Sequence, residues 1–165
     1  MGVDLGALGR PREAAVDATA AEEWRVPAAI AGADGTNAHA LACRWCGCAI
    51  LPAGRVTLLP DMAFALPPMP RARRAGDAAD SPPVGKEEGV GVWRAAGKYA
   101  FDNLGVSKGV EEVADERGGS KVLRLLVCAD CELGPFGWFV DDADRGEKTG
   151  EDVDFYVAVD RVRYL

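Results

Sequence analysis

The chain has 165 residues, a formal net charge of −7 and a pI near 4.8. A chain of this length is expected to form a single domain, and its acidic balance disfavours nucleic acid and anionic membrane surfaces as partners. No apolar run approaches the ~18–20 residues that span a bilayer, and the N-terminus lacks the basic-then-apolar order of a secretory signal. We therefore expect a cytosolic monomer.

Residues 1–40 are rich in alanine and glycine and hold few large apolar side chains. Pro11 could start an alanine-rich helix over residues 13–25, but a helix of about thirteen residues is marginal in water unless it docks. We expect this extension to be mostly disordered, so that the folded domain spans residues 41–165.

From Leu41 onward, short apolar runs are separated by glycine and proline, which is typical of β-structure. We expect a hairpin made from residues 56–59 and 63–66, with a turn between them at the Pro-Asp dipeptide. Residues 70–91 are rich in proline, arginine and glycine and offer little to pack. They are expected to form a flexible loop.

The second half of the chain contains the predicted core. Residues 122–127 form a nearly continuous apolar strand, residues 138–140 form another, and residues 155–159 alternate with a period of two, as a half-buried final strand does. An aromatic strand is expected around Phe101, and the charged stretches 111–121 and 141–154 are expected to be solvated loops. The pattern predicts a mainly β, antiparallel domain with few short helices.

Two Cys-x-x-Cys pairs are the strongest chemical signal in the chain. Cys43 and Cys46 form the first pair, and Cys128 and Cys131 form the second. Each pair can present two thiolates on a tight turn, so the four together could hold one zinc ion in a closed, structural site. Closing the long loop between the pairs costs only about 1.3 kcal/mol more than closing a compact module, whereas structural zinc supplies roughly 10–16 kcal/mol.

Other roles for the cysteines remain open at this point. One pair could be a redox motif, or the thiols could be unrelated buried side chains. Cys48, the fifth cysteine, is expected to be a buried apolar residue on a strand that leaves the first turn. His39, four residues before Cys43, is a less favoured replacement ligand.

Several motifs in the chain belong to one recognisable pattern: L-V-C-A-D-C-E-L-G-P-F-G-W at 126–138, F-Y-V-A-V-D-R-V at 155–162, C-x-x-C-G at 43–47, L-P-P-M at 66–69, Trp93, and F-D-N-L-G at 101–105. In these motifs the chain resembles the Rab-interacting factor family of the Mss-four type, zinc-binding exchange factors and chaperones of exocytic Rab GTPases. The resemblance implies a β-tent fold, in which short antiparallel sheets are joined at a zinc ion. It assigns the zinc ligands to Cys43, Cys46, Cys128 and Cys131.

The resemblance also implies a Rab-binding face, formed by residues 97–105 and the second cysteine turn. Its candidate contacts are Phe101, Asn103 and Asp130. Each has a structural alternative: Phe101 could belong to the core, Asn103 could shape a turn, and Asp130 could orient the metal turn through backbone amides.

We accordingly expect a guanine nucleotide exchange factor or holding chaperone that binds nucleotide-free Rab GTPases in vesicle transport, acts without covalent catalysis, and meets membranes only through its partner. Family members usually carry Asp-Met where this chain has Gly97-Lys98, which removes one acid and one apolar anchor from the face. The alternatives are an enzyme resembling methionine sulfoxide reductase, with Cys48 as its spare thiol, and a zinc-ribbon module that binds nucleic acid.

Overall fold

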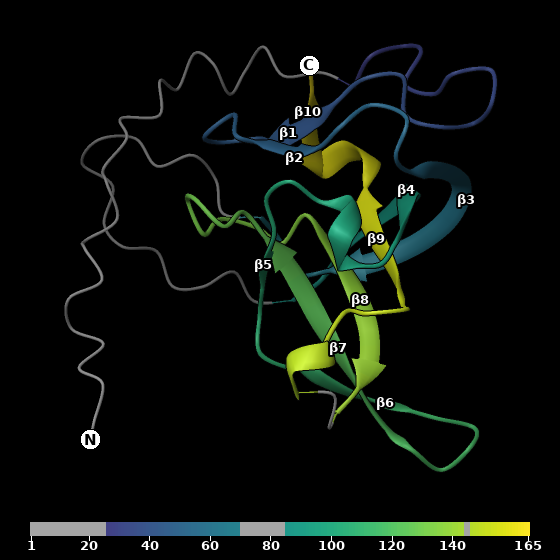
Figure 1. Cartoon of the computed structure of the whole chain (residues 1–165), viewed down its shortest axis with the longest axis vertical. Coiled ribbons are helices and arrows are strands. Elements are labelled where there is room, and N and C mark those ends of the chain that lie inside the picture. The colour runs from purple at the N-terminus through teal and green to yellow at the C-terminus, as the bar shows by residue number, and fades with distance from the viewer. Residues whose placement is uncertain (1–25, 70–84, 144–145) are drawn as a thin grey trace.

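The computed structural model describes residues 26–69, 85–143 and 146–165 (Figure 1). These residues form ten strands and three short 3₁₀ helices: β1 (Leu41–Cys43), β2 (Ala49–Leu51), β3 (Thr57–Leu66), β4 (Glu87–Ala96), η2 (Lys98–Ala100), β5 (Gly105–Val106), β6 (Glu111–Ala114), β7 (Ser120–Val127), β8 (Gly137–Asp142), η3 (Gly146–Lys148), β9 (Asp154–Ala158), η4 (Val159–Arg161) and β10 (Val162–Tyr164). No helix in these described parts has the length and apolar character needed to cross a membrane.

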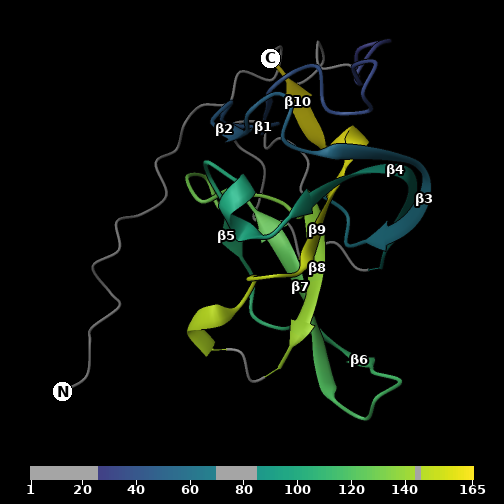
Figure 2. The ribbon, with the colours of Figure 1, turned by 45° about the vertical axis from the view of Figure 1, so that its right-hand side comes forward.

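The strands build two antiparallel sheets. The smaller has the order β10-β1-β2, and the larger has the order β3-β4-β9-β8-β7-β5, with β6 pairing to β7. Figure 2 shows the small sheet at one end of the large one, beside the C-terminus. The predicted mainly β, antiparallel class with few short helices is confirmed.

One hydrophobic core joins the two sheets. Leu41, Ile50 and Val162 from the small sheet belong to the same buried cluster as side chains of the large sheet, among them Trp93, Leu126, Phe139 and Phe155. In β9, Phe155 and Val157 point inward while Asp154 stays exposed, which is the period of two seen in the sequence. A second, smaller cluster on the large sheet contains Phe64, Leu66, Val92 and Ala158.

The prediction of a hairpin between residues 56 and 66 is wrong. This segment is one strand, β3, which pairs with β4 along its length, and the register shifts between Leu59 and Ala63. Pro60 and Asp61 lie in that irregularity. A proline cannot donate a hydrogen bond to a neighbouring strand, and it is tolerated in edge strands and at bulges. Here Pro60 lies in a bulge of the edge strand β3, and the chain does not reverse direction.

Other boundaries also differ from the sequence-based expectations. β4 begins at Glu87, so part of the predicted loop 70–91 is strand; residues 70–84 lie outside the described residues. Residues 111–121 form a β6–β7 hairpin in place of a solvated loop, and the strand at 155–159 is followed by β10, which pairs with β1. The region around Phe101 is a 3₁₀ turn and not a strand. The pairing of β10 with β1 and of β4 with β9 joins residues far apart in sequence, whereas the β6–β7 hairpin and the 3₁₀ turn are local.

The folded domain begins earlier than Leu41. Asn37 is only 1% exposed, and its side-chain oxygen accepts hydrogen bonds from the backbone of Arg55 (2.8 Å) and Val56 (3.1 Å). Its amide nitrogen donates to the carbonyls of His39 and Pro52. A buried amide with all these partners fixes the neighbouring loop. Residues 1–25 lie outside the described residues, so the expected disorder there stays a prediction.

A second buried polar side chain, Arg161, connects three segments. It is 4% exposed, and its Nη1 donates to the carbonyls of Pro67 (2.7 Å) and Pro135 (3.0 Å), while Nη2 lies 3.4 Å from a Glu87 carboxylate oxygen. The guanidinium therefore holds the end of β3 against the loop that follows the second cysteine pair.

Candidate metal centre and the adjoining surface

Four sulfur atoms from distant parts of the chain lie together where the two sheets meet. The Sγ atoms of Cys43 and Cys131 are 3.5 Å apart, those of Cys46 and Cys128 are 3.6 Å apart, and all four lie within 4.8 Å of one another. A regular tetrahedron with metal–sulfur bonds of about 2.3 Å has sulfurs roughly 3.8 Å apart. The four cysteines therefore fit the donor set and spacing of a tetrahedral metal ion.

The two cysteine turns have the same backbone pattern. In the first turn, Cys43 N–H donates to the Cys48 carbonyl (2.8 Å) and Gly47 N–H donates to the Cys43 carbonyl (3.0 Å). In the second, Cys128 N–H donates to Leu133 (3.0 Å) and Glu132 N–H donates to Cys128 (2.9 Å). The residue after each pair has a left-handed backbone, with φ of 74° at Gly47 and 59° at Glu132. The glycine satisfies this requirement without strain.

Burial affects the ionisation of two of the four thiols. Cys43 and Cys128 are buried, and Cys131 is half-buried. Burial raises the pKa of Cys43 and raises the pKa of Cys131 to about 11. A raised pKa favours the protonated thiol. A metal cation favours the thiolate instead, because it binds the deprotonated sulfur. With sulfur in all four positions, such a site is closed to water and has a structural role.

Two other residues, His39 and Cys48, were considered as a ligand or a reactive group, and neither belongs to the four-cysteine cluster. His39 Nδ1 is 3.1 Å from the Leu165 carbonyl, and the ring packs edge-on against Tyr164; His39 is not part of the sulfur cluster. Cys48 is half-buried, not an enclosed apolar residue as expected. A hydrogen bond with the Asp130 carboxylate, followed by one with Cys46, raises the pKa of Cys48 to about 12. This setting is the opposite of one that activates a thiol.

Asn103 joins the segment 97–105 to the second cysteine turn. Its Oδ1 accepts from the Ala129 backbone N–H (2.8 Å), and its Nδ2 lies 3.2 Å from Asp130 Oδ2 and 3.5 Å from Cys128 Sγ. Two of the three predicted contact residues thus touch each other. Asn103 bonds to the backbone of the turn that carries two candidate ligands, as its structural alternative requires. The Asp130 carboxylate bonds to the side chain of Asn103, and its proposed role through backbone amides stays a prediction.

Phe101 faces the core. Its ring centroid lies 5.3 Å from that of Phe155, and it packs as a half-buried side chain against the main buried cluster. The next residue, Asp102, donates its backbone N–H to the Ile50 carbonyl at 2.9 Å, which ties the segment to β2. Phe101 therefore packs against the core, which was the structural alternative considered for it. Its role as a partner contact stays a prediction.

Tyr99 lies in this segment but was not among the contact residues predicted from the sequence. It lies in η2, and with 80% of its surface exposed it is the most exposed large apolar side chain among the described residues. A hollow of about 530 Å³ opens beside it, between η2 and residues 151–154. The alternation of Tyr99 with Phe101 was visible in the sequence, but it predicts a shared direction only in a strand. In the 3₁₀ turn the two rings diverge.

Comparison with known proteins agrees with this geometry. The family model described as Mss4 protein matches residues 36–164, which include all four clustered cysteines and residues 97–105. A guanine nucleotide exchange factor MSS4 homolog of Drosophila melanogaster is 30% identical over 105 residues, covering 64% of this chain and 74% of that protein.

Replacing Cys128 by serine should remove the bound metal and unfold the domain. Structural zinc contributes roughly 10–16 kcal/mol in small modules, as much as the whole stability of a domain, about 5–15 kcal/mol. Cys48→Ser is the matched control, because Cys48 lies beside the cluster but is not one of its four members. Elemental analysis and circular dichroism measure the outcome. A Cys128→Ser protein that keeps one metal ion and native unfolding would contradict the assignment.

Replacing Asn103 by alanine should lower the free energy of unfolding by about 1–2 kcal/mol, because the Ala129 N–H and the Asp130 side chain lose their partner. Urea unfolding of the metal-loaded protein measures the change. Asp102→Ala is the control, since Asp102 is exposed and is tied to β2 through its backbone. Equal stability of the two variants would show that Asn103 does not support the second turn.

Proposed function

Because the chain belongs to the Mss4 protein family, we propose that it is a guanine nucleotide exchange factor for a Rab-type small GTPase. The main structural support comes from the segment 97–105 and the second cysteine turn, and we call Tyr99, Asn103 and Asp130 the exchange face. It combines an exposed aromatic side chain with an exposed carboxylate and a polar side chain that links to the second cysteine turn. Aromatic side chains of this kind are the usual energetic anchors of protein interfaces.

We propose zinc as the resident metal. Four cysteine sulfurs are the donor set of structural zinc sites, and the 3.5 and 3.6 Å sulfur–sulfur distances suit its bond length. The ion has no chemical step to perform. It holds the second turn in place, and Asp130 and the Asn103 contacts are positioned with that turn.

The proposed activity follows from linkage between two binding equilibria. A protein that binds the nucleotide-free GTPase more tightly than the loaded GTPase must weaken nucleotide binding by the same factor. Asp130 adds a negative charge to the exchange face and opposes the return of nucleotide phosphates nearby. The same preference stabilises an emptied GTPase by mass action, so exchange and holding-chaperone activity are two outcomes of one equilibrium.

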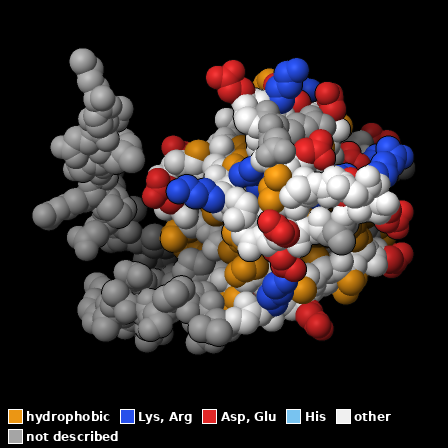
Figure 3. Space-filling view, turned by 90° about the horizontal axis from the view of Figure 1, so that it is seen from below, with side chains coloured by type: hydrophobic (Ala, Val, Ile, Leu, Met, Phe, Trp, Pro, Cys, Tyr) orange, Lys and Arg blue, Asp and Glu red, His pale blue; other side chains and the backbone are white. Residues whose placement is uncertain are grey.

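The working compartment and assembly state belong to the same proposal. Free thiols that bind metal require a reducing environment, so we propose a cytosolic monomer that reaches membranes through its GTPase. The rival functions have less support. A sulfoxide reductase needs a reactive thiol, and Cys48 lies beside the Asp130 carboxylate. A nucleic-acid module needs a basic surface, whereas acidic and basic side chains are interspersed on the face in Figure 3.

The proposal predicts faster release of a fluorescent GDP analogue from a loaded Rab GTPase when the protein is added. It also predicts a stable complex after the nucleotide is stripped, measured by size-exclusion chromatography. A small GTPase from outside the Rab group serves as the control and should show neither effect. If the loaded Rab GTPases tested release nucleotide at the unassisted rate and form no complex when stripped, the proposed function is wrong.

Tyr99→Ala should weaken binding to the stripped GTPase by roughly 30-fold, the equivalent of about 2 kcal/mol for the loss of an aromatic anchor. Folding and metal content should not change, because Tyr99 is 80% exposed. Val90→Ala is the control, since Val90 is 66% exposed near the start of β4. Surface plasmon resonance gives the affinities. Equal affinities for the two variants would remove Tyr99 from the exchange face.

A further inference from the structure

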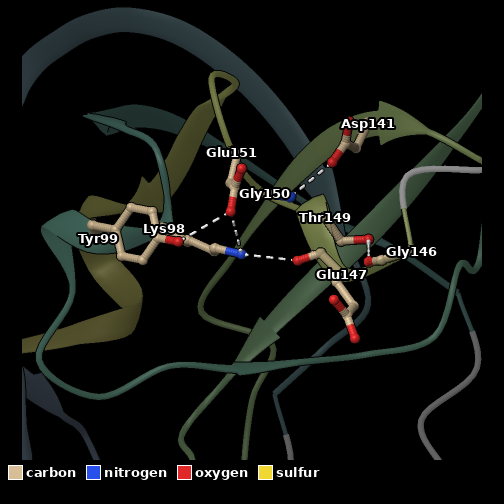
Figure 4. Close-up of polar contacts among 8 residues, drawn as sticks. All are labelled: Lys98, Tyr99, Asp141, Gly146, Glu147, Thr149, Gly150 and Glu151. Carbon is tan, nitrogen blue, oxygen red and sulfur yellow. Dashed lines mark hydrogen bonds and ion pairs between the residues drawn. The ribbon is translucent and has the colours of Figure 1, made fainter.

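Within the loop between β8 and β9, residues 146–153 pack directly against the turn that carries Tyr99. Figure 4 shows Glu151 and Gly150 of this loop beside Lys98 and Tyr99. The backbone of the turn depends on the loop: Lys98 N–H donates to the Gly150 carbonyl (3.0 Å), and Gly97 N–H donates to the Val153 carbonyl (2.9 Å). Two backbone donors at the start of a short helix are thereby satisfied from outside it.

A single carboxylate oxygen connects the loop to both side chains of the turn. Glu151 Oε1 accepts a hydrogen bond from the Tyr99 hydroxyl at 3.0 Å and lies 3.3 Å from Lys98 Nζ. Lys98 Nζ also donates to the Glu147 carbonyl at 3.3 Å (Figure 4). The Tyr99 hydrogen bond, and then that of Lys98, hold the pKa of Glu151 below its ordinary value.

The loop is itself anchored, so it can serve as a support. Asp141 at the end of β8 is 1% exposed, and its Oδ2 accepts from the Gly150 N–H at 2.7 Å. Gly150 has a φ of +80°, and a Cβ there would lie 2.9 Å from the Phe155 ring and 3.4 Å from Lys98. Gly150 is therefore held by close packing against Phe155 and Lys98 and by its hydrogen bond to the buried Asp141 carboxylate. These contacts fix the position of the next residue, Glu151, relative to the sheet.

We propose that Glu151 is a positioning residue of the exchange face, which fixes the Tyr99 ring in the orientation that the GTPase binds. This inference rests on the proposed function and adds the β8–β9 loop to it. Tyr99 is 80% exposed and would otherwise sample several rotamers, which binding must then restrict. Restraining the ring beforehand removes part of that entropic penalty, and the expected gain is about 3- to 10-fold in affinity.

Affinity for a stripped Rab GTPase tests the inference. Glu151→Ala should bind about 3- to 10-fold more weakly than the wild type, and Glu151→Gln should recover most of the loss because its amide oxygen still accepts from the tyrosine hydroxyl. In a Tyr99→Phe background, Glu151→Ala should have little further effect, since the bond is already absent. Glu147→Ala is the matched control: it removes the same charge from the same loop, and it keeps the backbone carbonyl through which Glu147 bonds to Lys98.

A measurement without the partner separates this inference from the proposed function. Relaxation of a labelled Tyr99 ring in the free protein should show greater mobility in Glu151→Ala than in the wild type or in Glu147→Ala. Unchanged ring mobility in Glu151→Ala overturns the inference, whether or not any GTPase binds. Equal loss of affinity in Glu151→Ala and Glu147→Ala also overturns it, because the effect would then be one of charge. Failure of the wild type to bind any stripped Rab GTPase overturns the proposed function instead.

Discussion

The convergence of four sulfur atoms is the constraint on which the rest of the structure depends. Cys43 ends a strand of the small sheet and Cys128 follows a strand of the large sheet, so the cluster joins the two sheets at one point. Burial raises the pKa values of Cys43 and Cys131, so without a metal these two thiols stay protonated at neutral pH. A cation held by all four sulfurs would bind them as thiolates and would restrain both sheets at one point.

The restraint extends from the sulfur cluster to the exchange face through one side chain. Asn103 contacts Cys128, Ala129 and Asp130, so it touches both the candidate metal centre and the surface proposed to meet the GTPase. Pairing of Gly105 with Val127 continues this connection along the backbone. Metal binding and partner binding are therefore expected to be coupled. The second cysteine turn supplies two candidate metal ligands, and it also carries Asp130 of the exchange face.

The segment 97–105 has little regular secondary structure, and it is held from both ends. At one end, Lys98 and Tyr99 are bonded to Glu151 and Gly150 of the β8–β9 loop. At the other end, Asn103 is bonded to the second cysteine turn. Since an interface gains affinity when its side chains are ordered before binding, these two supports explain how an irregular turn can present a defined surface.

The amino-acid pattern alone predicted the mainly β class, the strands at 122–127, 138–140 and 155–159 to within two residues, and the four cysteines that come together. Period-two alternation and paired Cys-x-x-Cys turns are local signals, and at these positions the folded structure keeps them. The position of Pro60 in a bulge and the burial of Asn37 and Arg161 became visible only in the folded structure. The tertiary structure also decided that Phe101 turns to the core while Tyr99 stays exposed beside Glu151. These outcomes rest on hydrogen bonds and packing between segments far apart in the chain, which no local pattern of residues specifies.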